Sequence, residues 1–555
     1  DGEPCRFLVF AHVLVGEREY ETAASFTTDG DSARFTFDPH TLWGERFPDA
    51  RFDLLASTPD VIEAMGGDEL LYADAAPAQS NTSTHVVFRT SPTRELAFTV
   101  TGSLTHMTDE EQIRLAAKYR ANPVDSAAML EEARAFWRQL IGGARVPDSV
   151  PDASAHNTTL PWLAHNALIH LSAPHGLEQF SGGAWGTRDA CQGPVEFLLA
   201  MFEPYAFIQG APAHGDIIVW PLKALCDYIE ATGDTAILDE PVPWRRQETF
   251  DITERTDTYA AHIKAALETI RSRFVPGTHL LRLGEGDWND ALQLADPLLR
   301  EHMVSSWTVA LLHHQLKRYS DVLRRAGQGD AASEIDVFAA SIRADFCTLL
   351  MADGVVAGYG LFDGDQKQPQ PELLIHPRDA RTGIHYSLIA MSSAITGGLL
   401  TPEEAAHHIS LICKHLSYPD GARLMDRMMP YSGGLERLFR RAESAAFVGR
   451  EIALMYVHAH LRYCDVLAEA GKRDELADAL AVVNPILVTE RLAHAYLRQR
   501  NVFFSSSDAA FSDRYAATAG WDKLETGEVP VDGGWRIYSS GPGLFLRLLS
   551  QYWKI

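Results

Sequence analysis

From about Thr158 to Ile555, apolar side chains recur every three or four residues in one segment after another, and Gly- and Pro-bearing loops separate the segments. This period places the apolar side chains along one face of an α-helix. The clearest stripes are Leu312, Leu316, Tyr319 and Leu323; Ile335, Phe338, Ile342, Phe346 and Leu349; and Ile452, Met455, Ala459, Tyr463 and Val466. The pattern predicts a mainly α-helical protein.

A long series of helices within one unit can form a closed ring or an open superhelix. An α-solenoid repeats at a fixed period, and we find no such period in the sequence. We therefore predict an α/α toroid over residues 156–555. In such a toroid inner and outer helices alternate, and the long loops at one end build the functional site.

Residues 1–105 have a different pattern, because short runs rich in aromatic and β-branched residues replace the helical period. Runs of this kind, such as 34–37 and 86–88, are typical of strands. Alternation over residues 94–100 places three apolar side chains on one face of a strand, namely Leu96, Phe98 and Val100. We expect a β-sandwich in this part of the chain.

Between these two regions we expect a helical linker at residues 106–155. Thr108 to Glu111 has the pattern of a capping box, which marks the start of a helix. The segment that follows is rich in Ala, Leu, Glu and Arg.

The charge balance excludes two classes of partner. The sequence has 74 acidic and 49 basic residues, a net charge of −25, and we find no cluster of Lys and Arg. A phosphate backbone or an anionic membrane surface would be repelled. No apolar run reaches the ~18 residues that a membrane-spanning helix needs. We therefore expect no nucleic-acid partner and no membrane partner.

The six cysteines lie far apart and form no CxxC pair, which argues against a zinc ribbon and against a disulfide scaffold. We expect a reducing cytoplasmic location. The chain begins with Asp1, and no basic segment followed by an apolar one opens it. This indicates a processed or truncated chain without a signal peptide.

The loop Leu283–Leu292, with the sequence LGEGDWNDAL, carries the most chemistry. Its acids lie beside Trp288, and a carboxyl group near an apolar, sugar-stacking surface can keep the proton that a general acid delivers to a glycosidic oxygen. The alternative is a capped turn in which Asp287 or Asp290 is a helix N-cap. The spacing alone leaves both interpretations open.

The loop Ser181–Pro194 combines glycines with Trp185, Arg188, Asp189 and Gln192. An aromatic face with bidentate donors and acceptors can bind a sugar ring and its neighbouring hydroxyls, and glycines let the backbone approach a ligand. The alternative is a structural role in which Arg188 and Asp189 hold the loop in place.

A third loop, Gly533–Gly543, precedes the apolar helix predicted at residues 544–553. Ser540, Gly541 and Pro542 would bring a hydroxyl and backbone N–H groups to the helix start, which suits an anion such as phosphate. The alternative is an ordinary Ser-Gly-Pro-Gly turn.

His458 and His460 lie two residues apart on a predicted helix. Residues at this spacing point to different sides, so the two imidazoles would not chelate one ion. We expect no metal. Donation to phosphate, or a hydrogen-bonded place in the core, is the prediction for each histidine.

These motifs, in this order, resemble glycoside hydrolase family 94, the inverting phosphorylases, and within it the members that act on β-1,2-linked glucans. The resemblance covers most of the chain. It rests on AWGTRDACQGPVEFL from Ala184, HGDIIVWPLKALCDYIEATGD from His214, GEGDWNDAL from Gly284, PDGARLMDR from Pro419, FRRAESAAFVGREIALMYVHAHLRY from Phe439, VFFSSSDAAFSDRY from Val502 and GGWRIYSSGPG from Gly533.

The resemblance implies an (α/α)6 barrel at residues 156–555, after a β-sandwich and a helical linker. It implies that Asp290 is the general acid. Its sugar-binding positions match Arg188, Asp189, Gln192 and Trp288, and we add Trp185 and Asp287 from the same two loops. Its phosphate-binding positions match His458, Ser540 and Gly541. Homodimers are common in the family.

One acid suffices for the implied reaction. An inverting hydrolase needs a second carboxylate to activate water, whereas in a phosphorylase phosphate is itself the nucleophile. With Asp290 protonating the leaving oxygen, phosphate would attack the anomeric carbon from the opposite face and release α-glucose 1-phosphate. The expected substrates are β-1,2-gluco-oligosaccharides and inorganic phosphate, with no cofactor.

The sequence departs from the family pattern in three places. Gln192-Gly193 replaces the Gln-Asp of cellobiose-type members, and SSGPG replaces a loop of the Thr-Gly-Thr type, so we do not expect cellobiose as substrate. The family usually has a larger N-terminal sandwich and a jelly roll after the barrel, so we expect a chain without those terminal domains.

Two alternative functions stay open. On the same barrel, a β-1,2-glucan hydrolase or transglycosylase could use Glu196, Glu443 or Asp508 as the base. A non-catalytic carbohydrate-binding protein would stack sugars on Trp185 and Trp288 without reacting.

Overall fold

The structure is a computed structural model that divides the chain into two units, Asp1–Ala135 and Phe136–Ile555. The division falls inside the segment predicted as a linker, while the predicted boundaries at 105 and 155 stay predictions. The residues that the structure describes are 2–12, 24–29, 32–72, 85–121, 125–172, 188, 191–192, 214–246, 252–362, 370–429, 435–444, 453–497, 503–533 and 540–553.

The first unit contains two antiparallel sheets, with strand orders β2–β3–β4–β7 and β1–β6–β5. Side chains from both sheets share one apolar core, which includes Phe26, Phe35 and Phe88. The runs predicted at 34–37 and 86–88 lie in strands, whereas only residues 98–100 of the predicted strand 94–100 lie in one, and Val100 there is 70% exposed. The strands are β1 (Leu8–His12), β2 (Ala24–Asp29), β3 (Ser32–Phe37), β4 (Arg51–Ala56), β5 (Ile62–Gly66), β6 (His85–Thr90) and β7 (Phe98–Ser103).

Helix α2 (Asp109–Ala121) begins as its sequence predicts. The backbone N–H of Thr108 donates to the Glu111 carboxylate, and the backbone N–H of Glu111 donates to the Thr108 hydroxyl, which completes the capping box. The helix packs on β7, where Gln112 donates to Thr101. It therefore belongs to the sheet unit, and the next helix, α3 (Ser126–Leu140), spans the division between the units.

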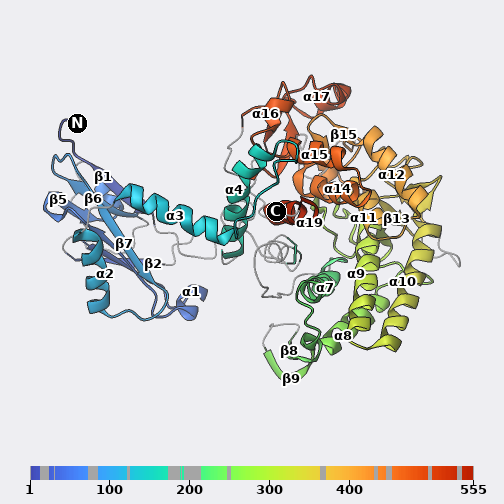
Figure 1. The fold of residues 1–555 in the computed structure, drawn as a ribbon, viewed down its shortest axis with the longest axis horizontal. Coiled ribbons are helices and arrows are strands. Elements are labelled where there is room, and N and C mark those ends of the chain that lie inside the picture. The colour runs from blue at the N-terminus through green and yellow to red at the C-terminus, as the bar shows by residue number, and fades with distance from the viewer. Residues whose placement is uncertain are drawn as a thin grey trace. The chain divides into compact units, whose positions relative to one another are not determined.

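In the second unit, helices that neighbour one another in a series alternate with helices that cover them from outside (Figure 1). The inner series is α7, α9, α11, α14 and α19, in which each helix contacts the next. The outer helices α10, α12, α15 and α4 pack on α9, α11, α14 and α19. Their bounds are α4 (Ala153–Ser172), α7 (Trp220–Thr232), α8 (Tyr259–Ser272), α9 (Ser306–Arg325), α10 (Gly329–Leu349), α11 (Leu388–Thr396), α12 (Pro402–His415), α14 (Val457–Glu469), α15 (Arg473–Val482) and α19 (Ser540–Trp553).

Helix α19 is the last helix of the unit, and it packs on α4, which lies near the start of the unit. A closed toroid stays a prediction. Helix α19 begins at Ser540, four residues before the helix start predicted at 544, so Pro542 lies in its first turn.

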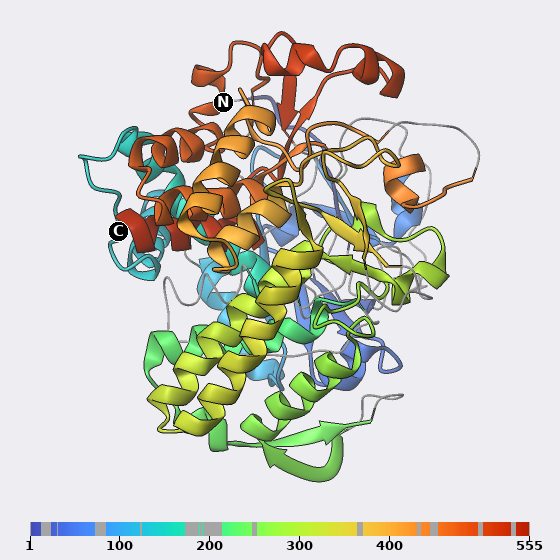
Figure 2. The ribbon, with the colours of Figure 1, turned by 90° about the vertical axis from the view of Figure 1, so that its right-hand side faces the viewer.

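Burial explains which helices are inner and which are outer. Helix α9 buries most of its surface, because it packs on α7, α10 and α11, and leaves a face with Lys317 and Asp321 exposed. It runs beside α10 in Figure 2. Helix α12 instead buries three residues on one face, His408, Ile409 and Ile412.

The apolar stripes predicted on α9 and α10 are all buried. The third stripe is wrong at one residue, because Met455 lies in a two-residue strand and α14 begins at Val457. Ile452 lies outside the described residues. Ala459, Tyr463 and Val466 are buried on α14 as expected.

Short strands connect the helices and hold the loops at their ends. Two three-stranded sheets matter for the site, with orders β10–β13–β14 and β17–β18–β19. The remaining strands are β8 (Pro241–Arg245), β9 (Ile252–Thr258), β10 (Met303–Ser305), β11 (Met351–Ala352), β12 (Val355–Val356), β13 (Tyr359–Leu361), β14 (Glu372–Leu374), β15 (Ser417–Tyr418), β16 (Gly421–Ala422), β17 (Met455–Tyr456), β18 (Ser506–Ala509) and β19 (Val531–Gly533). The short α-helices are α1 (Leu42–Arg46), α13 (Arg440–Ser444), α16 (Val488–Arg491), α17 (Arg514–Ala519) and α18 (Asp522–Glu525).

Among the described residues, no helix is both long enough and apolar enough to cross a membrane.

Helix α10 offers a test of this packing. Phe346 is fully buried, whereas Val337 on the same helix is 69% exposed. We expect Phe346→Ala to lower the free energy of unfolding by about 3–5 kcal/mol, because it leaves a cavity, and Val337→Ala to change it by less than about 0.5 kcal/mol. Denaturant titrations followed by helix circular dichroism check both values. Similar effects of the two variants would contradict the described packing of α10.

Candidate active site

Two loops of the second unit lie side by side and form the base of the candidate site. His214 and Gly284 form an isolated antiparallel bridge. The backbone N–H of Gly215 donates to the carbonyls of Leu283, at 2.8 Å, and Gly286, at 3.1 Å. The HGD segment is thereby joined to the loop predicted to carry the acid.

Gly215 allows this close approach because it has no side chain. A Cβ atom at this position would lie 2.4 Å from the backbone oxygen of Arg282 and 2.9 Å from that of Leu283. Real Cβ contacts are longer, so any other residue would push the two loops apart.

Asp216 links these two loops to the neighbouring segments. Its carboxylate is fully buried and accepts two hydrogen bonds from Arg188, from Nε at 2.7 Å and Nη2 at 2.9 Å. A third comes from the Trp220 indole N–H, at 2.8 Å. Arg188 also lies 3.0 Å from Nδ1 of His214. Arg188, which we predicted to bind sugar, is therefore anchored at Asp216.

Within the acid loop, side chains accept hydrogen bonds from backbone N–H groups of the same loop. Asp287 Oδ1 accepts the backbone N–H of Asn289 at 2.8 Å, and Asn289 Oδ1 accepts that of Ala291 at 3.2 Å. Asn289 is thus the N-cap of the short 3-10 turn Asp290–Leu292. The capped turn that we considered exists, but its cap is Asn289 rather than Asp287 or Asp290. We call residues 284–292 the acid turn.

Asp287 lies inside the protein and does not line a cavity. It is 1% exposed, and its Oδ2 accepts a hydrogen bond from the Tyr359 hydroxyl at 3.1 Å. Its pKa is raised to about 6, mainly by burial and in smaller part by Asp216, against the lowering effects of Ser305, the Asn289 N–H and Arg188. The sugar contact that we predicted for Asp287 stays a prediction.

Trp288 brings together residues that are far apart in the sequence. Its ring centroid lies 5.1 Å from that of His458 and 5.3 Å from that of Tyr456. Trp307 lies 6.5 Å from Trp288, and Trp220 lies 6.2 Å from Trp307. The acid turn and the predicted phosphate-binding histidine therefore meet in one aromatic cluster.

Three inner helices begin at this cluster. Trp220 is the first residue of α7, Trp307 the second of α9 and His458 the second of α14. The N-terminus of a helix carries a partial positive charge and unpaired N–H groups. The partial positive charges of three helix starts therefore lie at this cluster, close to the buried carboxylates of Asp216 and Asp287.

His458 and His460 have different surroundings, as their spacing predicts. His460 accepts the backbone N–H of Ala422 at 2.9 Å and lies 2.8 Å from the carbonyl of Ala479. Burial lowers its pKa, so it is a neutral core residue. His458 is 6% exposed and lines the cavity described below.

A small sheet joins the start of α14, which carries His458, to the strand β19. Strand β17, which leads into α14, pairs with β18, and β18 pairs with β19, which precedes the late loop. Gly541 in the first turn of α19 is buried, and a Cβ atom there would lie 2.0 Å from the Phe503 ring. The glycine is therefore required at the predicted phosphate-binding position.

A cavity of about 710 Å³ opens among the inner helices, and three predicted site residues line it: Gln192, Trp288 and His458. Gln192 is 2% exposed and donates to the backbone carbonyl of Arg188 at 3.1 Å. The volume is within the range of small-molecule sites.

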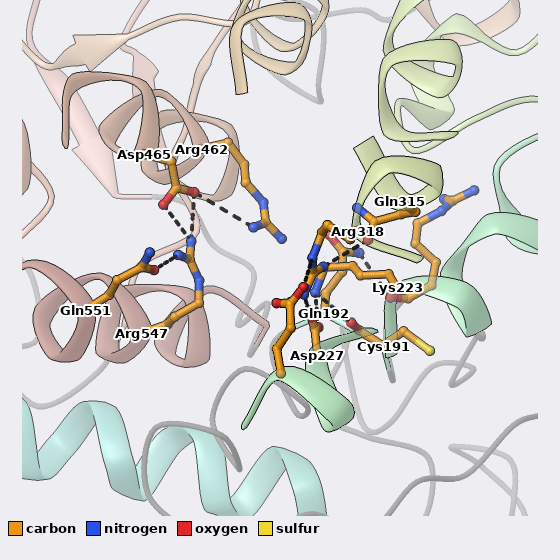
Figure 3. Close-up of polar contacts among 12 residues, drawn as sticks. Cys191, Gln192, Lys223, Asp227, Gln315, Arg318, Arg462, Asp465, Arg547 and Gln551 are labelled. Carbon is orange, nitrogen blue, oxygen red and sulfur yellow. Dashed lines mark hydrogen bonds and ion pairs between the residues drawn. The ribbon is translucent and has the colours of Figure 1, made fainter. Parts of the chain in front are cut away.

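Charged side chains line the rest of the cavity in two groups (Figure 3). In one, Asp227 accepts hydrogen bonds from Lys223 and Arg318, both at 2.6 Å. In the other, Asp465 accepts two from Arg547, at 2.8 and 2.7 Å. Each carboxylate lies between cations, so the wall is charged but locally balanced.

The remaining predictions fall partly outside the described structure. Trp185 and Asp189 lie outside the described residues. For Asp290 and Ser540, the structure describes the backbone at the start of a 3-10 turn and of α19, and their side chains lie outside the description. Their predicted roles stay predictions.

Glu443, one of the alternative bases, is held by backbone groups. Its carboxylate accepts the N–H groups of Arg437, Leu438 and Phe439 at 2.6 to 2.8 Å. A carboxylate that accepts three such donors is committed to the local structure. Glu196 lies outside the described residues, and Asp508 lies in β18 opposite Asp532.

Within the described residues, no group of three or more His, Cys, Asp and Glu side chains could hold a metal ion.

Sequence reasoning did not assign site roles to His214, Asp216 or Tyr359. The HGD motif was the available signal for the first two, because a histidine and an acid beside a glycine are typical of a functional loop. We find no local signal for Tyr359, whose contact with Asp287 joins residues that lie 72 apart in the sequence.

Comparison with known proteins supports the resemblance found in the motifs. Residues 208–368 match the family model described as "Glycosyl hydrolase 94 superfamily, catalytic domain". The match includes His214, Asp216, the acid turn and Tyr359, and ends before His458.

Among curated relatives, the chain is 40% identical over 468 residues to 1,2-beta-oligoglucan phosphorylase of Listeria innocua, which covers 79% of this chain and 42% of the relative. It is 28% identical to a cyclic beta-(1,2)-glucan synthase of Rhizobium meliloti, over 30% of this chain and 7% of the relative. The chain thus spans less than half the length of each. A bacterial glucoamylase structure matches with a TM-score of 0.52 at 9% identity, over 96% of this chain and 74% of that one, and indicates a similar fold.

The close approach at Gly215 predicts the effect of one added methyl group. We expect Gly215→Ala to lower the free energy of unfolding by about 1–3 kcal/mol, the usual cost of overpacking. Gly329→Ala is the control, because nothing lies within 4 Å of its Cβ position. Thermal unfolding of both variants tests this, and an unchanged transition in Gly215→Ala would contradict the described contact between the loops.

Proposed function

This chain carries a match to the catalytic domain of the glycosyl hydrolase 94 superfamily, and from this premise we propose that it catalyses inverting phosphorolysis of β-1,2-gluco-oligosaccharides. The products are α-glucose 1-phosphate and a shortened sugar. The observation that carries the proposal is the contact of Trp288 with His458, which joins the acid turn to the predicted phosphate site beside one cavity.

In the proposed reaction, Asp290 protonates the glycosidic oxygen as the bond to the anomeric carbon breaks. Phosphate attacks that carbon from the opposite face, so the configuration inverts. His458, with Ser540 and Gly541 at the start of α19, binds the phosphate, and the positive ends of the inner helices favour its charge.

The sugar is bound by the loop residues Trp185, Arg188, Asp189 and Gln192 together with Trp288. The β-1,2 linkage is supported by the names of both curated relatives reported above, which are a beta-oligoglucan phosphorylase and a glucan synthase of that linkage. Asp287 belongs to the same turn as Trp288, and its carboxylate holds the backbone of that turn through the Asn289 N–H.

A hydrolase on the same barrel is the second candidate, and the state of Glu443 weakens it. That carboxylate accepts three backbone N–H groups and is poorly placed to activate water. Asp508 remains as the base that a hydrolase would need.

We also propose a complete (α/α)6 barrel, a β-sandwich in the first unit, a homodimer and a cytoplasmic location. The inner and outer helices support the first, and the shared core of the two N-terminal sheets supports the second.

The test is to incubate the chain with β-1,2-gluco-oligosaccharides, with and without inorganic phosphate, and to measure glucose 1-phosphate and reducing sugar. We expect phosphate-dependent glucose 1-phosphate. Asp290→Asn should lower kcat at least about a hundredfold, the scale of a positioned proton donor. Asp321→Asn on the exposed face of α9 is the control and should leave kcat unchanged.

Reducing sugar formed without phosphate would move the assignment to a hydrolase. Full activity of Asp290→Asn would remove Asp290 as the acid.

A variant of His458 separates phosphate binding from sugar binding. We expect His458→Ala to raise the KM for phosphate roughly tenfold or more, because a hydrogen bond to a charged group contributes about 1.5–3 kcal/mol, with a smaller change in the KM for the sugar. His407→Ala, on the exposed side of α12, is the matched control. Equal changes in both KM values would argue against phosphate binding at His458.

A further inference from the structure

Buried side chains of the sheet β10–β13–β14 hold the acid turn at Asp287, and Tyr359 of β13 is one of them, beside Ser305 of β10. Tyr359 of β13 is 3% exposed, and its hydroxyl donates to Asp287 Oδ2 at 3.1 Å. The other oxygen of Asp287 accepts the backbone N–H of Asn289. The tyrosine and the turn are therefore joined through a single carboxylate.

That carboxylate and the Asn289 side chain fix the backbone on both sides of Trp288 and Asp290. Asp287 binds the N–H of Asn289, and Asn289 binds the N–H of Ala291. Asp290 lies between these two contacts. A shift of Asp287 would thus move the backbone that carries Asp290.

Tyr359 is suited to hold Asp287 because it remains a donor. Burial and the neighbouring carboxylate raise the pKa of Tyr359 well above its usual value. The other groups that face Asp287 are Ser305 at the end of β10, Asp216 and Arg188. The negative charge of Asp216 disfavours a negative charge on Asp287. Loss of the Tyr359 hydroxyl would therefore leave the Asp287 carboxylate less stabilised.

Tyr359 and Asp287 do not line the cavity, whereas Trp288 does. A change at Tyr359 therefore reaches a bound sugar through the turn and not by direct contact.

We propose that Tyr359 is a positioning residue for the reaction, whose hydroxyl fixes Asp287 and through it the turn that presents Asp290 to the glycosidic oxygen. This inference rests on the proposed function. It assigns a role in the proposed reaction to a strand residue that the motifs do not contain.

The test compares Tyr359→Phe with Tyr418→Phe in the full chain. Tyr418 is also buried, donates to the backbone carbonyl of Asp426 at 3.2 Å and does not line the cavity. Kinetics with β-1,2-gluco-oligosaccharides and phosphate between pH 5 and pH 8, together with thermal unfolding, are measured for both. Each variant removes one buried hydroxyl and nothing else.

We expect kcat of Tyr359→Phe to fall about ten- to a hundredfold, because small displacements of a reacting group are costly, while both KM values change less than about threefold. The acid limb of its pH profile should move to higher pH, because Asp287 takes up a proton more readily without its donor. Tyr418→Phe should keep the kinetics of the wild type.

A double-mutant cycle tests the route through Asp287. If Tyr359 acts through that carboxylate, Tyr359→Phe in an Asp287→Asn background should lower kcat no further than Asp287→Asn alone.

Three results would overturn the inference: an unchanged kcat and pH profile in Tyr359→Phe, equal losses in the two tyrosine variants that follow their unfolding temperatures, or additive losses in the cycle. A wild-type chain that forms no glucose 1-phosphate would instead overturn the proposed function, and the inference with it.

Discussion

The buried carboxylate of Asp216 is the constraint on which the site depends. A charge removed from water must be held by donors, and breaking such an arrangement costs about 3–5 kcal/mol. Arg188 and Trp220 supply the donors here. Arg188 lies 28 residues before Asp216 in the sequence, so this carboxylate joins a distant part of the chain to the HGD segment and to the start of α7. Through Gly215 that segment then holds the acid turn.

The aromatic cluster shows how the proposed phosphate binding could occur in a strongly acidic chain. A net charge of −25 acts over the whole surface, but salt screens it beyond about 8 Å. At shorter range, the starts of α7, α9 and α14 surround Trp288 with partial positive charge. Local donors would therefore govern the affinity for the proposed phosphate at this point more than the distant surface charge does.

The parts predicted well from the sequence are those set by local periodicity. The stripes on α9 and α10 are buried because helical spacing alone decides which side chains share a face. Met455 was misassigned because β17 exists through its pairing with β18, about fifty residues later in the chain, and periodicity carries no information on such pairs. The cap of the acid turn falls on Asn289 because hydrogen-bond geometry selects among neighbouring polar residues that spacing treats alike. Tyr359 was missed for a similar reason, since the contact that gives it a role is made across the sheet and not along the chain.

The separation between the acid turn and the cavity wall bears on how such a protein can evolve. Buried side chains that do not line the cavity hold the backbone of the turn, whereas the wall residues other than Trp288 and Gln192 lie on the inner helices. Substitutions on those helices can reshape the cavity without disturbing the contacts that hold the turn. In related proteins built in this way, the linkage and chain length of the substrate could change during evolution while the proposed reaction stays the same.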